Sequence, residues 1–244
     1  MPEETGTQQA MVIVAHPDDA EFGCAGTVAR WADEGWHVTY VILTDGSGGG
    51  PDDAVDVGPA ARQAISRQRK AEQRAAADVL GVKEVLFLDY PDGSLQPTLE
   101  LRRDIVRVVR QYRPARVVIP SPDRVWASNY ILRRQHPDHL AAGEAALAAL
   151  YPAAQNPWDF PELLEEGLAP HRVAEIYVMG APVLNYAVDI TSTIDRKIEA
   201  LRAHRSQLGD RFAELERMIR TMAAERGVKH GMEYAEEFHR IVHG

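Results

Sequence analysis

One histidine and three carboxylates crowd into the six residues 16–21. They are His16, Asp18, Asp19 and Glu21. Carboxylates this close repel one another, and a bound cation would offset that cost. Pro17 has a fixed φ and no N–H, which suits a sharp exit from a strand, so His16 and Asp19 could point at one centre with Asp18 beside it. This arrangement suits metal-assisted hydrolysis. The alternative is that Asp18 or Asp19 only caps a following helix.

A second histidine cluster, His136-Pro137-Asp138-His139, lies far along the chain, just before an expected helix. A third neutral ligand here would complete a set of two histidines and one aspartate and leave a position for water, as a catalytic zinc requires. The alternative is a surface turn with two histidines and a helix cap. Because Cys24 is the single cysteine, the chain has no cysteine-rich zinc module, and any metal must use histidine and carboxylate ligands.

The elements that must position these residues alternate along the chain. We expect strands at 11–14, 37–43, 84–88, 116–120, 174–179 and 186–190. We expect helices at 19–34, 61–80, 99–112, 139–150, 194–208 and 210–224. The alternation predicts an α/β fold, a Rossmann-like three-layer α/β/α arrangement with a mostly parallel sheet. Ligands of such folds bind at the carboxyl ends of the strands, where His16, Asp45, Asp89 and Ser121 fall.

Composition narrows the class of protein. The 244 residues suffice for one large α/β domain, so we expect residues 1–244 to form a single domain with 1–9 flexible. A net charge of −9 argues against nucleic-acid binding. No apolar run reaches the ~20 residues that a membrane span needs, and the acidic, polar N-terminus does not look like a signal peptide. Together these features predict a cytoplasmic protein.

The motifs resemble those of the PIG-L/LmbE-like family of zinc-dependent N-deacetylases, which includes N-acetylglucosaminyl-phosphatidylinositol deacetylases and deacetylases of mycothiol and bacillithiol biosynthesis. The resemblance covers nearly the whole chain. Its specific marks are AHPDDAEFGCAGT at 15–27 and HPDH at 136–139. Supporting marks are TDGSGG at 44–49, RKAEQRAAADVLGV at 69–82, DYPDG at 89–93, DIT at 189–191, HRSQ at 204–207 and YAEEF at 234–238.

The resemblance implies a role for each residue of the two histidine clusters. His16, Asp19 and His139 would ligate one Zn²⁺ per chain, or another divalent metal. Asp18 would be the general base that takes the proton of the attacking water. Protonated His136 would help to stabilise the tetrahedral intermediate, and either His136 or Asp18 would protonate the departing amine. Asp138 would orient an imidazole from outside the ligand set. Glu21 is expected to favour the helix N-terminus electrostatically rather than to bind metal.

Other parts of the chain receive weaker predictions. By resemblance, Arg69 and Asp92 could contact sugar hydroxyls or a substrate anion; the alternative for Arg69 is a solvated helix charge paired with Glu72. The glycine-rich loop 46–50 is interpreted as a mobile rim of the site. Substrate specificity is expected from the loops 46–60, 122–135 and 152–172. The arginines near helix 99–112 are expected to form mostly a solvated face; they are residues 102, 103, 107, 110, 113 and 116.

The leading functional hypothesis is a zinc hydrolase that removes an acetyl group from an N-acetylglucosamine-type sugar or its conjugate. An amidase that cleaves larger N-acyl or thiol-sugar conjugates with the same residues is the second hypothesis. A sugar- or nucleotide-binding module without catalysis is the third, and it predicts no bound metal. The expected partner is a small N-acetylated amino sugar, and the family also implies a homo-oligomer, trimeric or hexameric.

Overall fold

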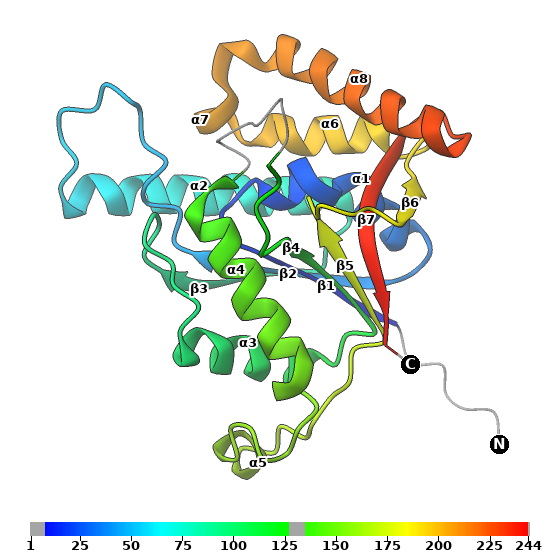
Figure 1. Ribbon diagram of the computed structural model, residues 1–244. Helices are drawn as coiled ribbons and strands as arrows, with labels where there is room; N and C mark the ends of the chain where they lie inside the picture. The colour runs from blue at the N-terminus through cyan, green and yellow to red at the C-terminus, as the bar shows by residue number, and fades with distance from the viewer. Residues whose placement is uncertain (1–7, 127–134, 244) are drawn as a thin grey trace.

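Within residues 8–126 and 135–243, which the computed structural model describes, seven strands form one sheet in the order β3-β2-β1-β4-β5-β7-β6 (Figure 1). They are β1 (Gln9–Val14), β2 (His37–Thr44), β3 (Glu84–Tyr90), β4 (Arg116–Pro120), β5 (Glu175–Met179), β6 (Tyr186–Asp189) and β7 (Ala235–Val242). Strands β1 to β5 are parallel, whereas β7 is antiparallel to both β5 and β6. The predicted α/β fold with a mostly parallel sheet is confirmed.

Helices cover both faces of the sheet (Figure 1). On one face lie α1 (Asp19–Asp33), α2 (Pro59–Leu80), α6 (Ile194–Ala203) and α8 (Phe212–His230), and on the other α3 (Leu99–Tyr112) and α4 (Pro137–Ala148). Side chains of β1 alternate between the two layers: Met11 and Ile13 join the core under α3 and α4, and Val12 and Val14 the core under α1 and α2. Since both faces of β1 are buried, its sequence is apolar from Ala10 onward.

Strand β7 was not predicted, and its sequence AEEFHRIV explains why. Two acidic residues and a histidine interrupt the apolar pattern that marks a strand. One of the acids, Glu236, nevertheless points into the core and is 1% exposed. Glu236 forms a buried ion pair with Lys197. An acidic residue in the core therefore hides the alternation of apolar and polar residues from which a strand is predicted.

Several element boundaries differ from the prediction; α8, for example, ends at His230 rather than at residue 224. Strand β1 begins at Gln9, so the stretch 1–9 that was expected to be flexible ends inside the sheet. The helix expected over 194–208 is interrupted at His204, and a separate turn, α7 (Arg205–Leu208), follows it. Helix α4 begins at Pro137 rather than His139, because proline favours the first turn of a helix.

The segment 152–172 lies at the amino ends of the parallel strands. It follows α4, which is roughly 18 Å long at 1.5 Å per residue, and includes the short helix α5 (Glu162–Glu165) at the lower end of Figure 1. Arg110 fixes its start: the guanidinium is buried and donates to the carbonyls of Ala153, Ala154, Asn156 and Asp159. Arg110 thus departs from the expected solvated face, and the segment does not line the site of its own chain.

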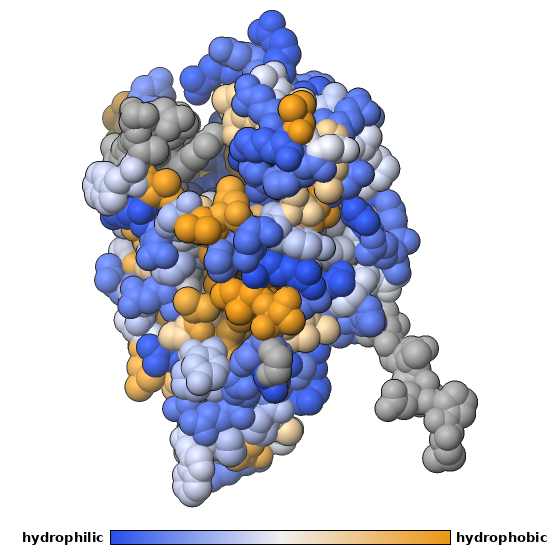
Figure 2. All heavy atoms as spheres, turned by 45° about the vertical axis from the view of Figure 1, so that its right-hand side comes forward, coloured by the Kyte–Doolittle hydropathy of each residue, from blue (hydrophilic) through white to orange (hydrophobic). Residues whose placement is uncertain are grey.

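Strand β3 forms one edge of the sheet, and β6, four residues long, forms the other. On this side of the molecule, Figure 2 shows apolar side chains gathered across the middle of an otherwise largely hydrophilic face. Val183 and Leu184, just before β6, are both exposed. A strand this short offers few unpaired backbone groups to another sheet edge.

Candidate active site

The site lies at the point where the strand order reverses. From β1 the chain proceeds outward to β2 and β3, and it then returns to β4 on the other side of β1. Loops that leave the carboxyl ends of β1 and β4 diverge here, and in open α/β sheets such a divergence forms the crevice in which ligands bind. His16 follows β1, and the loop after β4 leads to His136 at the start of α4. The topology thus joins two motifs that are distant in sequence.

Three carboxylates surround the buried imidazole of His16. Its Nε2 lies 3.1 Å from Asp138 Oδ2 and 3.1 Å from Asp92 Oδ1, and its Nδ1 lies 3.5 Å from Asp19 Oδ2. Burial lowers the pKa of His16, but hydrogen bonds to Asp138, Asp19 and Asp92 outweigh it and raise the pKa to about 12. Positive charge is therefore strongly favoured at this point, whether a proton or a metal ion supplies it.

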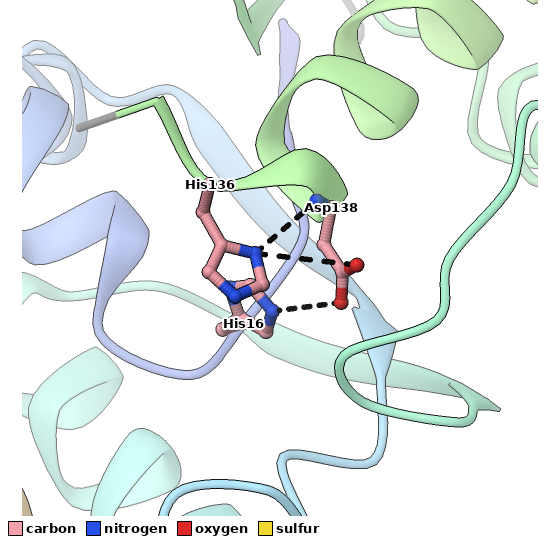
Figure 3. Close-up of side chains that lie close together, drawn as sticks. All are labelled: His16, His136 and Asp138. Atoms are coloured by element: carbon pink, nitrogen blue, oxygen red, sulfur yellow. Dashed lines mark hydrogen bonds and ion pairs between the residues drawn. The ribbon is translucent and has the colours of Figure 1, made fainter. Parts of the chain in front are cut away.

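Asp138 holds two imidazoles in place (Figure 3). Its carboxylate is fully buried and accepts from the Gly93 N–H at 2.8 Å and the Leu95 N–H at 3.2 Å. Burial raises the pKa of Asp138, but the hydrogen bonds from His16 and from the Gly93 N–H outweigh it and hold the pKa below its ordinary value. The Asp138 N–H in turn donates to His136 Nδ1 at 3.2 Å.

This last hydrogen bond determines the tautomer of His136. Because Nδ1 accepts, a neutral His136 carries its proton on Nε2, the nitrogen that remains available as a donor. Burial and then the charge of His16 lower the pKa of His136, which favours this neutral form. His136 can therefore donate one hydrogen bond into the crevice without being charged.

Two overlapping groups of ligand atoms lie within 4.8 Å of one another: His16 with Asp19 and His139, and His16 with His136 and Asp138. In the second group, both Asp138 oxygens already accept from backbone N–H groups. In the first group, His139 Nε2 lies 3.0 Å from Asp19 Oδ1, and both side chains are partly exposed. Two imidazoles and one carboxylate form a donor set that zinc accepts. The first group, which is the predicted one, fits a divalent metal better.

Asp18 lies beside this group in an unusual backbone conformation. Its φ of 93° and ψ of −23° are in the left-handed region, which residues other than glycine rarely adopt. Burial raises the pKa of Asp18 to about 6, although the charge of Arg69 lowers it. A metal ion bound nearby would also lower it, because a neighbouring cation favours the carboxylate. Asp18 is thus a carboxylate beside the metal group that can accept a proton from water.

Arg69 is buried rather than solvated, which overturns the alternative of a surface charge paired with Glu72. Its guanidinium donates to the carbonyls of Pro17 at 2.8 Å and Gly46 at 3.1 Å. It also lies 3.4 Å from Asp18 Oδ2 and 3.5 Å from Asp92 Oδ2. The Glu72 carboxylate instead accepts hydrogen bonds from the N–H and the hydroxyl of Ser206. Arg69 therefore links the loop after β1 to the loop after β2.

The glycine-rich loop after β2 is tethered at several points. The Gly48 N–H donates to Asp92 Oδ2 at 2.9 Å, and Gln207 donates to the Gly49 carbonyl at 2.8 Å. A Cβ on Gly49 would lie 2.4 Å from Arg69 Nη1, so this position needs glycine for the backbone to approach the guanidinium. The interpretation as a mobile rim gives way to a packed wall against Arg69 and Asp92.

Glu21 has a different environment from the one expected. It lies in the first turn of α1, but its side chain is fully buried and accepts from Gln73 at 3.0 Å. Its other oxygen lies 3.1 Å from Nε2 of His204, which is also buried. Gln73 was not among the predicted site residues. The signal for it is its position four residues after Arg69 on the same helix, which places both side chains on one face.

The specificity loop 122–135 is mostly outside the structural description, since residues 127–134 are not among the described residues. Trp126, at the end of the described part, is 78% exposed.

Within the described ranges, no helix is both long and apolar enough to cross a bilayer.

A crevice that can hold a divalent metal next to a carboxylate with raised pKa has the parts of a metal-dependent hydrolase. Residues 11–150 match the family model described as PIG-L: GlcNAc-PI de-N-acetylase. Diacetylchitobiose deacetylase of Thermococcus kodakarensis is 34% identical over 94% of this chain and 81% of its own length. The chain belongs to the PIG-L family.

Two further relatives agree. The structure of N,N'-diacetylchitobiose deacetylase from Pyrococcus horikoshii superposes with a TM-score of 0.84, at 32% identity, over 96% of this chain and 84% of that one. A Bacillus anthracis protein named a probable N-acetyl-alpha-D-glucosaminyl L-malate deacetylase 2 is 31% identical, over 86% of each chain. The recognition made from the sequence motifs is confirmed.

Proposed function

We propose that this protein is a metal-dependent N-deacetylase that hydrolyses the acetamido group of an N-acetylglucosamine-type sugar or conjugate. The observation that carries the proposal is the grouping of His16, Asp19 and His139 with Asp18 beside them at the switch point of the sheet. The names of the relatives support the reaction and the class of substrate. We further propose that the chain forms a single catalytic domain, because all its described strands belong to one sheet.

His16, Asp19 and His139 are proposed to hold Zn²⁺ or another divalent metal. When bound, such an ion supplies Lewis acidity, which makes water easier to deprotonate and polarises a carbonyl oxygen. The hydrogen bond of His16 Nε2 to Asp138 leaves Nδ1, which faces Asp19, as the nitrogen available to the metal. Asp138 would act from outside the ligand set by fixing the ring and its tautomer.

The chain's own residues would then move the protons. Asp18 accepts a proton from the water that attacks the amide carbonyl. The Nε2–H of His136 donates a hydrogen bond to the oxyanion that forms on the carbonyl oxygen. When the C–N bond breaks, Asp18 returns its proton to the departing nitrogen, so the products are acetate and an amine. Arg69 and Asp92, which meet at the wall of the crevice, are proposed to contact the sugar.

The test is acetate release from diacetylchitobiose and a panel of other N-acetylglucosamine conjugates, before and after metal removal. Chelation should abolish the release, and stoichiometric Zn²⁺ should restore it. A metal-free sample that keeps its full rate would exclude the mechanism. Conjugates with acyl groups larger than acetyl belong in the same panel, because preference for them would favour the amidase. Cytoplasmic location and a trimeric or hexameric state stay predictions.

A further inference from the structure

Two side chains of helix α2 form hydrogen bonds to one peptide group, one to its carbonyl and one to its N–H. The peptide that joins Pro17 to Asp18 contributes the Pro17 carbonyl and the Asp18 N–H. Arg69 Nη2 donates to that carbonyl at 2.8 Å, and Gln73 Oε1 accepts from that N–H at 2.9 Å. Arg69 and Gln73 are four residues apart, one turn of the helix, so their side chains reach the same peptide from one face.

The orientation of this peptide plane sets φ of Asp18. That angle is 93°, in a region sparsely populated for residues with a Cβ. Such a conformation persists only where its surroundings over-determine it, and it is often part of a functional site. The two hydrogen bonds from α2 supply that constraint. Without them φ of Asp18 could relax toward negative values, and the turn that carries the Asp18 carboxylate would lose its fixed geometry.

The side-chain amide of Gln73 has one orientation that satisfies its neighbours. Its Nε2 donates to Glu21 Oε1 at 3.0 Å, and a carboxylate only accepts. The oxygen of Gln73 must therefore face the Asp18 N–H. His204 Nε2 lies 3.1 Å from the second oxygen of Glu21, and all three side chains are at most 1% exposed. The interruption of the helix at His204 brings this imidazole to Glu21.

We propose that Gln73, oriented by Glu21 and His204, is a positioning residue that holds the Asp18 carboxylate toward the metal group. The proposal rests on the proposed function, since Asp18 is the general base there. It assigns a role to Glu21, Gln73 and His204, which the reaction itself does not use.

The test reverses the polarity of the Gln73–Glu21 pair. At a pH above the range in which two adjacent buried carboxylates share one proton, Gln73→Glu places a second negative charge against Glu21, so the pair repels and the grip on Asp18 loosens. Displacements near 1 Å can cost roughly 100-fold in rate, so we expect kcat to fall by about 10- to 100-fold, with KM and bound metal nearly unchanged. The double variant Glu21→Gln/Gln73→Glu restores every donor–acceptor match and should recover kcat to within about threefold of the parent protein.

The matched control is Gln63→Glu, the same change at an exposed position of α2; it should leave kcat unchanged. Thermal unfolding separates positioning from folding. If the double variant regains the parent Tm but not kcat, the cluster only stabilises the fold, and the proposal is wrong. A Gln73→Glu variant with undiminished kcat would also overturn it.

A second measurement needs no substrate, so it distinguishes failure of this inference from failure of the proposed function. Hydrogen exchange of the Asp18 amide should be slow in the parent protein and at least tenfold faster in Gln73→Met, relative to amides in the core of β1. Equal exchange in the two proteins would refute the grip, whatever the substrate. Absence of deacetylation in the parent protein would instead refute the proposed function alone.

Discussion

Two buried groups of charged side chains lie near helix α1, one beside its middle and one at its N-terminal end, and they are built differently. Between α6 and β7, Lys197 and Glu236 form one ion pair at 2.6 Å, with both side chains at most 3% exposed. Glu236 also accepts from the N–H groups of Gly26 and Thr27 and from the Thr27 hydroxyl. Lys197 donates in addition to the Phe22 carbonyl. In this group, one positive charge neutralises one negative charge.

The group around His16 has no such balance. Asp19, Asp92 and Asp138 all approach one imidazole, and Asp18 lies close by. Arg69 is the side-chain guanidinium that the structure brings to Asp18 and Asp92, and much of its hydrogen bonding goes to backbone carbonyls. Loss of one partner from a balanced, saturated pair destabilises a fold, whereas an excess of carboxylates around imidazoles is ready for a cation. The predictions below test whether the two groups separate in this way.

Asp18→Asn should have the largest effect, and on turnover alone. The amide cannot accept a proton, and loss of a general base typically costs about 10²- to 10⁴-fold in rate. Asparagine tolerates the left-handed conformation, so the backbone and the metal group should persist. We would measure acetate release, metal content and Tm together, with Asp78→Asn on exposed α2 as the control. Unchanged turnover would remove Asp18 from the mechanism.

Lys197→Met should affect stability alone. It leaves the Glu236 carboxylate buried without its partner, which typically costs about 3–5 kcal/mol in the free energy of unfolding. The folded fraction should deacetylate at the parent rate. Lys229→Met is the matched control, because Lys229 is 61% exposed and its partner Glu237 keeps a contact with His230; a pair with an exposed lysine contributes at most about 1 kcal/mol. Denaturant unfolding gives both values, and similar losses in the two variants would contradict the comparison.

The sequence was informative where chemistry is written in short motifs. HPDD and HPDH identified the family and named the residues that the structure brings together, because histidine and aspartate have few reasons to recur in this pattern. The alternation of strands and helices predicted the sheet, because parallel strands buried on both faces are apolar throughout. Both signals are local in the chain.

Contacts between distant segments were not predictable. The buried side chains of Gln73, Arg110 and Glu236 look like surface residues in the sequence, since polar residues are seldom fully buried. Each is buried because partners elsewhere in the chain satisfy it: Asp18 and Glu21, the carbonyls after α4, and Lys197. The same limitation misplaced the segment 152–172, whose position depends on Arg110.

Asp138→Asn should have the smallest effect, and it tests whether the surplus of carboxylates is tuned to the metal. The substituted amide has one acceptor oxygen, so it cannot serve the N–H groups of Gly93 and Leu95 and also accept from His16. If its NH₂ turns toward His16, the imidazole proton moves to Nδ1, the nitrogen proposed to bind metal.

Loss of such an outer partner typically weakens metal affinity by 10- to 100-fold, roughly 1.4–2.7 kcal/mol. We would measure the Kd for Zn²⁺ by competition with a chelating dye, and kcat at saturating metal, which should fall far less than in Asp18→Asn. Asp78→Asn again serves as the control. An unchanged Kd would mean that Asp138 holds the loop at Gly93 and does not tune the metal ligand. Asp138 would then be a structural residue within the acid-rich group.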